Sequence, residues 1–368
     1  MRHNLFICVL VGSMVAACSR SPHSGTFLSA ALQESLEATV LEKMDREKIP
    51  GLSLAVMSEG ALVWSRGFGY ADVENAVPAT TETVYRLASV SKTMTAMAAM
   101  VLAEKGRLDL DKPVQTYCPA FPEKQGTLTA RHLLAHTGGV RHYSDTEDPQ
   151  SLGYKHFNDT ASALEIFKDD PLRFEPGTDY LYTTFGFQVL GCAIEGASGQ
   201  TLLQTLKRNV WDPSGLTRTQ VDDSAALIPH RAQGYRLSEN GWLNSAMTDT
   251  SYKVPGGGLS STAEDLARFG DAVLTHKLVS AKTLGQMFTE IILPDGRGTK
   301  YGLGWILGTS KWGQEVYHTG SQERVRTVLY FIPDKRLIVT VLANLEEAVP
   351  LALARQITEQ VLTSRGSE

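Results

Sequence analysis

The chain has 368 residues, a formal net charge of −5, 42% hydrophobic and 20% charged residues, and four cysteines. This composition is that of a globular protein and excludes disordered, collagen-like and coiled-coil chains. The mild acidity leaves no basic excess to neutralise phosphates, which argues against a general nucleic-acid binder, and four cysteines are too few for a disulfide scaffold.

The N-terminus has the pattern of an export signal. A positive start over 1–4 is followed by an apolar run over 5–15, shorter than the ~20 residues needed to cross a bilayer. Small residues then precede Cys18, and this segment resembles a bacterial lipobox, in which the cysteine is acylated and becomes the new N-terminus. The alternative is a plain signal peptide with a chance cysteine. We therefore expect a lipoprotein signal peptide over 1–17, a tether over 18–26 and one folded domain over 27–365.

Ser19, rather than aspartate, follows the lipobox cysteine. In bacteria with two membranes this resemblance implies an outer-membrane lipoprotein, so we expect an exported, lipid-anchored protein that faces the periplasm. That compartment is oxidising. Cys118 and Cys192 remain after processing, and the sequence leaves open whether they pair; the apolar neighbours of Cys192 suggest a buried small side chain.

Hydrophobic periodicity predicts the elements of the domain. Apolar residues four apart indicate an N-terminal helix. The segment between 84 and 194 is predicted to be mostly helical, with breaks at glycine and proline residues. Ser261 and Glu264 have the spacing of a capping box. Two pairs of short apolar runs flank turn residues, as in β-hairpins. The expected elements are helices over 27–48, 261–274 and 348–362, and hairpins of 52–57 with 62–68 and of 325–332 with 337–342.

Strands therefore lie at both ends of the chain, and helices fill the middle. An isolated two-stranded hairpin is only marginally stable, so the two hairpins need partners. The economical arrangement is an α+β fold. We expect an antiparallel sheet of N- and C-terminal strands flanked by the terminal helices, with an inserted helical lobe.

Ser89 and Lys92 form the chain's only Ser-x-x-Lys spacing. The residues over 94–103 are apolar nearly all round, which predicts a buried helix with Lys92 one turn after Ser89 on the same face. Burial disfavours a charged lysine, and a neutral amine is able to take the proton of a serine hydroxyl. Free N–H groups at the helix start would favour an oxyanion. The alternative is that Ser89 caps the helix and Lys92 extends to solvent.

Two further passages carry polar groups close to turns. Tyr182 follows a Pro-Gly turn at 176–177 and precedes an apolar helix, where a phenol would be placed to pass protons; the alternative is core packing. His318 lies in a strand of small residues before the C-terminal hairpin, and such a strand edge admits a substrate backbone and offers an N–H donor. The alternative is an exposed imidazole.

In this order, the Ser-x-x-Lys motif, the triplet at 182–184 and the strand 318–320 resemble the serine β-lactamase and penicillin-binding superfamily. The sequence around these motifs resembles the class C-like branch of the superfamily. Within that branch it is most similar to the mitochondrial serine β-lactamase-like proteins and their bacterial relatives. The segments that carry the resemblance to the branch are 128–139, 256–262 and 331–334, with 251–253 pointing to the mitochondrial type. The resemblance runs from about residue 27 to residue 362.

The resemblance implies a β-lactamase/transpeptidase-like fold, a serine hydrolase and a role for each matching residue, without a cofactor or metal. Ser89 would be the acylated nucleophile and Lys92 its base or proton relay. Tyr182 would be a general base that later protonates the leaving group. The backbone N–H groups of Ser89 and Ser321 would form the oxyanion hole. Substrate-binding residues would be Thr184, His318, Thr319, Gly320 and Ser321.

Two departures from the superfamily's motifs bear on the substrate. Thr184 stands where an asparagine is common, and His318 stands where penicillin-recognising members commonly have lysine. A histidine of ordinary pKa is mostly neutral at pH 7, so a permanent anchor for a β-lactam carboxylate is weakened. We therefore expect hydrolysis of peptides, esters or related acyl compounds rather than a dedicated β-lactamase. Arg324 and Arg326 are candidates to supply the positive charge that His318 lacks. The simpler interpretation is that both are solvent-exposed residues of a strand.

Other hypotheses remain at this point. The chain could be a non-catalytic anchored sensor or filament-forming scaffold, or a true class C-like β-lactamase or D-alanyl-D-alanine carboxypeptidase. His132, His136 and His142 invite a metal site, but no glutamate follows His132 as a metalloprotease requires, and structural roles are expected. The expected partners are a small-molecule or peptide substrate and a membrane contacted only through lipid, with no nucleic acid; a homo-oligomer is left open.

Overall fold

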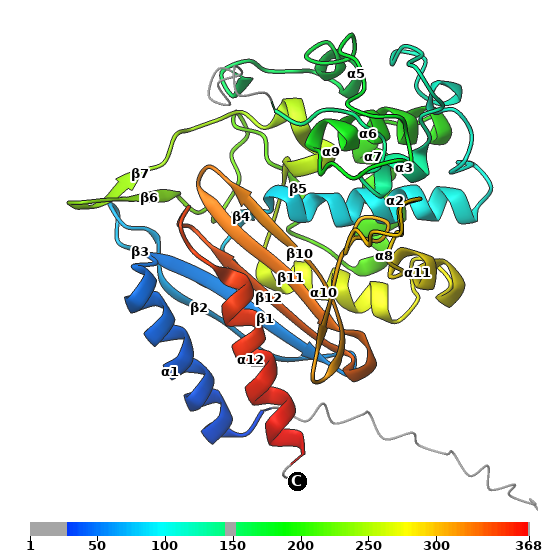
Figure 1. The fold of residues 1–368 in the computed structure, drawn as a ribbon. Coiled ribbons are helices and arrows are strands. Elements are labelled where there is room, and N and C mark those ends of the chain that lie inside the picture. Colours follow the sequence, from blue (N-terminus) through cyan, green and yellow to red (C-terminus); the bar gives the residue numbers. More distant parts are fainter. Residues whose placement is uncertain (1–27, 144–151, 367–368) are drawn as a thin grey trace, which may run out of the picture.

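A computed structural model describes residues 28–143 and 152–366. The predicted signal peptide, Cys18 and all of the tether lie outside the described residues. In the described part of the chain, the largest sheet has seven strands in the order β3-β2-β1-β12-β11-β10-β9 (Figure 1). Its strands are β1 (Gly51–Ser58), β2 (Ala61–Asp72), β3 (Val77–Pro78), β9 (Ile306–Ser310), β10 (Gly313–Gln322), β11 (Val325–Ile332) and β12 (Leu337–Ala343).

The N- and C-terminal hairpins meet in the middle of this sheet. Strand β1 pairs antiparallel with β12, with Leu54 opposite Val341, and every residue of both strands is buried. Because both faces are covered, these strands are continuously apolar rather than alternating. The predicted α+β fold with one antiparallel sheet of terminal strands is confirmed, and β9 and β10 extend it beyond the two predicted hairpins.

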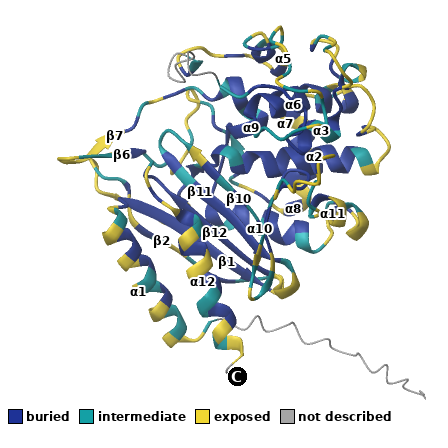
Figure 2. Cartoon of the chain, viewed as in Figure 1, coloured by how far each residue is buried: buried dark blue, intermediate teal, exposed yellow. Residues whose placement is uncertain are grey.

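The terminal helices cover one face of the sheet. Helices α1 (Ala30–Glu47) and α12 (Pro350–Arg365) lie side by side there (Figure 1), and α12 packs on β11 and β12. Leu36 and Val40 of the first helix and Ile357 of the second are fully buried, whereas the outer sides of both helices are exposed (Figure 2). Amphipathic patterning of this kind made both helices predictable.

The opposite face of the sheet carries α10 (Ala263–Leu274), which packs on β1 and β12. Its cap differs from the predicted one. Ser261 belongs to β8 (Leu259–Ser261), and the Thr262 side chain accepts the N–H of Asp265. The capping threonine is therefore one residue later than the serine of the predicted capping box.

Beyond α10 lies the helical lobe. Its central helices are α2 (Ser91–Glu104), in which residues 91–102 are all buried (Figure 2), and α6 (Thr184–Ser198). The segment between them is less helical than predicted, because short helices alternate with turns. The remaining helices are α3 (Ala130–Leu134), α5 (Thr160–Leu164), α7 (Leu202–Leu206), α8 (Asp212–Ser214), α9 (Val254–Gly257) and α11 (Ala281–Met287), with 3₁₀ turns η1 (Ala88–Val90), η2 (Val114–Thr116), η4 (Ser251–Lys253) and η5 (Pro333–Lys335) and a π turn η3 (Lys207–Trp211).

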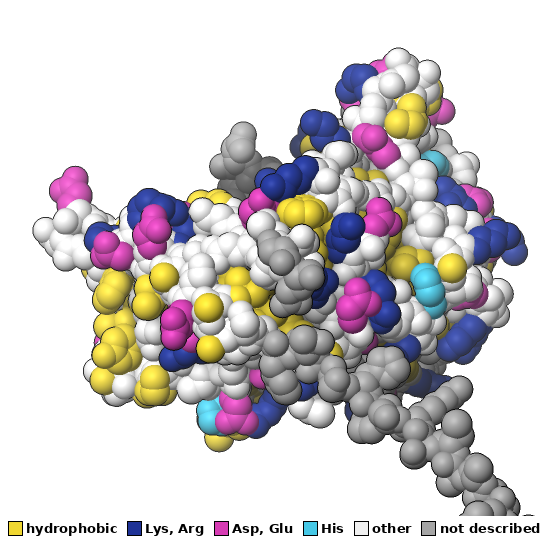
Figure 3. All heavy atoms as spheres, turned by 90° about the horizontal axis from the view of Figure 1, so that it is seen from below, with side chains coloured by type: hydrophobic (Ala, Val, Ile, Leu, Met, Phe, Trp, Pro, Cys, Tyr) yellow, Lys and Arg dark blue, Asp and Glu magenta, His cyan; other side chains and the backbone are white. Residues whose placement is uncertain are grey.

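Small sheets join the lobe to the main sheet. Strands β4 (Tyr85–Arg86), β8 and β5 (Gln220–Val221) form one, and β6 (Tyr235–Ser238) pairs with β7 (Gly241–Asn244) in another. On the face shown in Figure 3, basic and acidic side chains are interspersed. None of the described helices is long and apolar enough to span a membrane.

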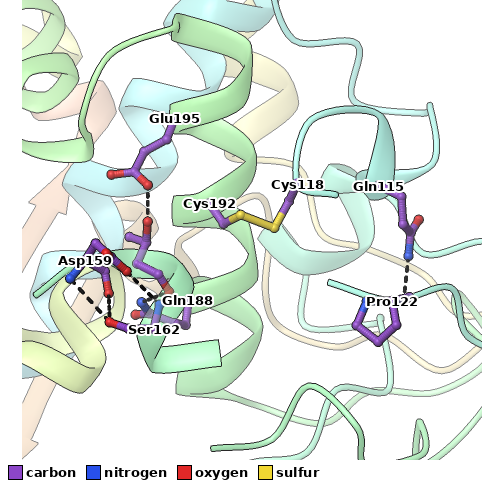
Figure 4. Close-up of a disulfide and its surroundings, with 9 residues drawn as sticks. Gln115, Cys118, Pro122, Asp159, Ser162, Gln188, Cys192 and Glu195 are labelled. Atoms are coloured by element: carbon purple, nitrogen blue, oxygen red, sulfur yellow. Dashed lines mark hydrogen bonds between the residues drawn. A yellow bond between two sulfur atoms is a disulfide. The ribbon is translucent and has the colours of Figure 1, made fainter. Parts of the chain in front are cut away.

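A disulfide ties the lobe together. Cys192 of α6 is bonded to Cys118 beside η2, with 5.4 Å between the Cα atoms (Figure 4). The pairing that the sequence left open is thus present, and Cys192 is buried as a half-cystine rather than as a free thiol.

Removing this bond should lower the stability of the lobe. The two cysteines are 74 residues apart, and a cross-link over a long loop restricts the unfolded chain. We expect the Cys118→Ser/Cys192→Ser double variant to lose about 2–4 kcal/mol of unfolding free energy in urea titrations. Reductant should shift the wild-type midpoint in the same direction and leave the variant unchanged; an unshifted wild type would contradict the prediction.

Candidate active site

Ser89 lies in η1, between β4 and α2. Its neighbour Ala88 has φ of +49°, a left-handed conformation that is uncommon for a residue with a Cβ. The Leu87 N–H donates to the Leu259 carbonyl, which fixes the turn against β8. Ser89 therefore precedes the α-helix by a single turn and is partly exposed in a cavity, as a nucleophile must be.

Lys92 of α2 has no solvent-exposed surface. Its Nζ lies 3.2 Å from Ser89 Oγ, 3.1 Å from Thr184 Oγ1 and 2.6 Å from the Gly256 carbonyl oxygen. A neutral amine has two N–H donors and one lone pair. Since the carbonyl only accepts, one N–H of a neutral amine must point to Gly256, and the second N–H and the lone pair are shared between the Ser89 and Thr184 hydroxyls.

The electrostatics favour this neutral amine. Burial, assisted by the positive charge of Lys253, holds the pKa of Lys92 well below its ordinary value. No carboxylate forms an ion pair with Lys92 anywhere in the described residues. An uncompensated buried ammonium is costly, so the proton is lost instead. The alternative in which Lys92 extends to solvent is excluded by its burial.

Tyr182 immediately precedes α6, and its ring centre lies 4.9 Å from Lys92 Nζ. Its hydroxyl shares a hydrogen bond with Ser89. Burial raises the pKa of Tyr182 well above the ordinary value, a shift that the hydrogen bond with Ser89 partly opposes. The structure thus brings Ser89, Lys92 and Tyr182 together, with the phenol protonated at neutral pH.

One buried histidine and one half-buried histidine position the residues that follow this tyrosine. The Thr183 N–H donates to His136 Nδ1 and the Thr184 N–H to His142 Nδ1, each at 3.2 Å. Such N–H groups at a helix start have no partner within the helix. Burial lowers the pKa of His136 well below the ordinary value and that of His142 to about 4, so both accept as neutral imidazoles. These histidines, considered above as metal ligands, hold the N-terminus of α6.

The strand predicted to border the substrate is β10. His318 is 1% exposed, which rules out the exposed imidazole of the alternative. Its Nδ1 bonds the Thr319 carbonyl oxygen at 2.7 Å, and its Nε2 lies 2.9 Å from the Tyr301 hydroxyl. Burial lowers the pKa of His318 to about 3. The imidazole is therefore neutral and both of its nitrogens are occupied.

Gly320 holds β10 against the turn that carries Ser89. A Cβ at this position would overlap the Thr327 hydroxyl and the Leu87 carbonyl. Thr327 itself donates to the Leu87 carbonyl at 2.8 Å. Gly320 does not line the cavity, so its place in the structure is at the contact behind the site rather than beside substrate.

A cavity of about 330 Å³ opens above Ser89. Strand β9 pairs with β10 only as far as Tyr317, which leaves the edge of β10 open to this cavity from His318 onward. Of the predicted residues, Ser89, Tyr182, Thr184, His318, Thr319 and Ser321 line it. The sequence analysis did not assign the other lining residues, His142, Tyr143, Lys253, Gly256, Gly257, Ile306 and Gln322.

The remaining polar candidates lie elsewhere. Arg324 donates to Gln233 Oε1 at 2.6 Å, and Arg326 donates to the Gln322 carbonyl at 2.9 Å; neither lines the cavity. The described residues hold no group of three or more histidine, cysteine, aspartate or glutamate side chains placed to bind a metal.

A sequence model of the Beta-lactamase family matches residues 36–362. The chain belongs to the beta-lactamase family. Members of this family with this fold are serine hydrolases. Ser89 and Lys92 both lie within the matched residues.

Named relatives of this beta-lactamase family chain agree with the assignment. "Serine beta-lactamase-like protein LACTB, mitochondrial" of Homo sapiens is 34% identical over 62% of this chain and 54% of that protein. "Penicillin-binding protein 4*" of Bacillus subtilis is 31% identical over 78% of this chain and 66% of that protein. The chain thus spans little more than half the length of the human relative. The octameric penicillin-binding protein homologue from Pyrococcus abyssi superposes with a TM-score of 0.77 and 28% identity over 90% of this chain and 77% of that one.

The burial of His318 predicts a pH dependence of stability. Its folded pKa of about 3 lies below an unfolded value of about 6.5, so between these values only the unfolded state binds the proton. Stability is therefore intact above pH 6.5 and falls as the pH drops, by about 1.4 kcal/mol per pH unit for this group. Urea titrations at pH 7, 6 and 5 should show a shallower decline for His318→Gln; equal slopes would contradict the prediction.

Proposed function

We propose that the protein is a serine hydrolase that acts through an acyl-enzyme on peptide, ester or related acyl substrates. The observation that carries the proposal is the Lys92 amine, buried, without an anionic partner and 3.2 Å from the Ser89 hydroxyl. A base in this state is matched to the task of removing a serine proton near neutral pH.

In the first step Ser89 Oγ attacks the substrate carbonyl carbon while its proton passes to Lys92 Nζ. The carbonyl oxygen becomes an oxyanion, and we assign its stabilisation to the backbone N–H groups of Ser89 and Ser321. Both residues line the cavity. The new ammonium keeps the Gly256 carbonyl and the Thr184 hydroxyl as hydrogen-bond acceptors.

Collapse of this intermediate requires a proton for the leaving group. Tyr182 is protonated and hydrogen-bonded to Ser89, so its phenol donates that proton and is reprotonated from Lys92. The raised pKa of Tyr182 favours this donor role over that of a first general base. Water then attacks the acyl carbon and gives a proton to Lys92, and one proton returns through Lys92 and Tyr182 to Ser89 Oγ as the acyl bond breaks.

The substrate preference is proposed from the state of His318, which stands where penicillin-recognising members commonly have a lysine. His318 is neutral, and Tyr301 and the Thr319 carbonyl occupy its nitrogens, so it supplies no anchor for the carboxylate of a β-lactam. This supports a peptidase or esterase over a dedicated β-lactamase or a D-alanyl-D-alanine carboxypeptidase. A non-catalytic scaffold would have no need of a deprotonated lysine beside a partly exposed serine.

Covalent labelling tests the proposed nucleophile and base. A fluorophosphonate probe should add one label to the wild type and none to Ser89→Ala, as measured by intact mass. Lys92→Arg keeps its proton because a guanidinium does not deprotonate, and Tyr182→Phe loses the donor; each should slow ester hydrolysis by roughly 10²–10⁴-fold.

Lys112→Arg, at an exposed position, is the matched control for Lys92→Arg and should retain full activity. Circular dichroism checks that each variant is folded. Labelling that persists in Ser89→Ala, or an absence of labelling in the wild type, would refute the hydrolase and favour the scaffold.

We also propose that Cys18 is acylated and that the domain is exported and anchored to the outer membrane. The Cys118–Cys192 disulfide supports export, because such bonds persist in oxidising compartments. In a bacterial host, the wild type should fractionate with membranes and Cys18→Ser with the soluble periplasm. Mass analysis that finds an unmodified Cys18, or a mature chain that begins elsewhere, would overturn the proposal.

A further inference from the structure

Lys253 is the cavity-lining residue for which the mechanism above has no use. It ends η4 and is 5% exposed. Its Nζ lies 5.0 Å from the ring centre of Tyr252 and 6.0 Å from that of Tyr143. In the described part of the chain this ammonium forms no ion pair and donates no hydrogen bond to any side chain or carbonyl. A buried cation that touches only ring faces lacks an acceptor.

Gln322, at the end of β10, lines the same cavity with a second unused donor. Its Nε2 is buried and has no hydrogen-bond partner. Gly257 lies between the two side chains: a Cβ there would be 3.5 Å from Lys253 Cδ, 3.6 Å from Gln322 Oε1 and 3.8 Å from the Ala88 carbonyl carbon. The two side chains therefore flank one glycine beside the turn that presents Ser89.

The rest of the lining supplies no anion. None of the described residues around the cavity is an aspartate or glutamate. His142 and His318 have pKa values of about 4 and about 3, and burial holds the pKa of Lys92 well below its ordinary value. Glu323, which follows Gln322, does not line the cavity and forms no ion pair with Lys253. The described lining of the cavity thus offers two nitrogen donors without a hydrogen-bond partner and no acidic side chain.

We propose that Lys253 and Gln322 bind a carboxylate of the substrate while the acyl carbon lies at Ser89. The ammonium would neutralise the carboxylate, and the amide N–H would donate to one of its oxygens. This inference rests on the proposed hydrolase activity and narrows its substrates to acyl compounds that carry an anionic group. It places the positively charged part of the site on a residue from η4 rather than at position 318 of β10, where histidine stands in place of the lysine common in penicillin-recognising members.

Paired esters test this preference. The first substrate of each pair is a 4-nitrophenyl half-ester of a dicarboxylic acid, from glutaric to suberic, which carries a free carboxylate. The second is the neutral 4-nitrophenyl alkanoate of the same chain length. The value of kcat/KM is compared within each pair after spontaneous hydrolysis has been subtracted. We expect the wild type to favour the half-ester at one or more lengths. Lys253→Met should lower kcat/KM for that half-ester by about 10–100-fold, the loss of a charge-assisted hydrogen bond, while the neutral ester changes far less.

Three further variants sharpen the comparison. Lys253→Arg should keep most of the preference because it keeps the charge, and Gln322→Leu should weaken it. Lys112→Met removes an exposed positive charge and should change neither ester. Turnover of the neutral ester shows in each variant that the protein is folded. Equal losses on both esters in Lys253→Met, or a wild type that favours the neutral ester at every length, would overturn the inference.

A binding measurement separates this inference from the hydrolase proposal. Calorimetric titration of Ser89→Ala with the free dicarboxylates does not depend on turnover. Binding that is lost in Ser89→Ala/Lys253→Met would support the anion site even if no ester were hydrolysed. Absent binding combined with normal turnover of neutral esters would refute the anion site and leave the hydrolase standing.

Discussion

The site depends on a lysine that is buried without a counter-ion. Full burial of an ammonium costs several kcal/mol unless an anion compensates it, and Lys92 is offered only the Gly256 carbonyl and two hydroxyls. An aspartate within reach would have kept the proton on the amine and removed the base. The apolar sequence that surrounds Lys92 in α2 therefore sets its chemistry as well as its packing.

The partners of this amine come from distant parts of the chain, so the site exists only when the sheet and the lobe are docked. Thr184 comes from α6, and Gly256 from α9, which precedes β8. The contact of Gly320 with Leu87 fixes the spacing between β10 and the Ser89 turn. A change at any of these docking contacts would alter the distance between Ser89 and β10 without touching substrate, which makes stability and activity hard to separate here.

Local sequence patterns made part of the fold and of the site predictable. The hairpins, the terminal helices and the one-turn spacing of Ser89 and Lys92 follow from residues close in sequence. The burial of His318, the Cys118–Cys192 pairing and the grouping of Lys253 with Gln322 depend on contacts between segments tens to hundreds of residues apart, which periodicity does not encode. The segment between α2 and α6 was predicted to be mostly helical because it contains many apolar residues. In the structure these residues lie in short helices and turns.

The side chains of His318 and Lys253 both bear on the charge around the Lys92 amine. His318 is neutral and adds no positive charge there, whereas the Lys253 charge helps lower the pKa of the amine. A substrate carboxylate bound by Lys253 would screen that charge and raise the pKa of Lys92. Binding of an anionic substrate thus raises the proton affinity of Lys92. By reciprocity, protonation of Lys92 must raise the affinity of the site for the anionic substrate by the same factor.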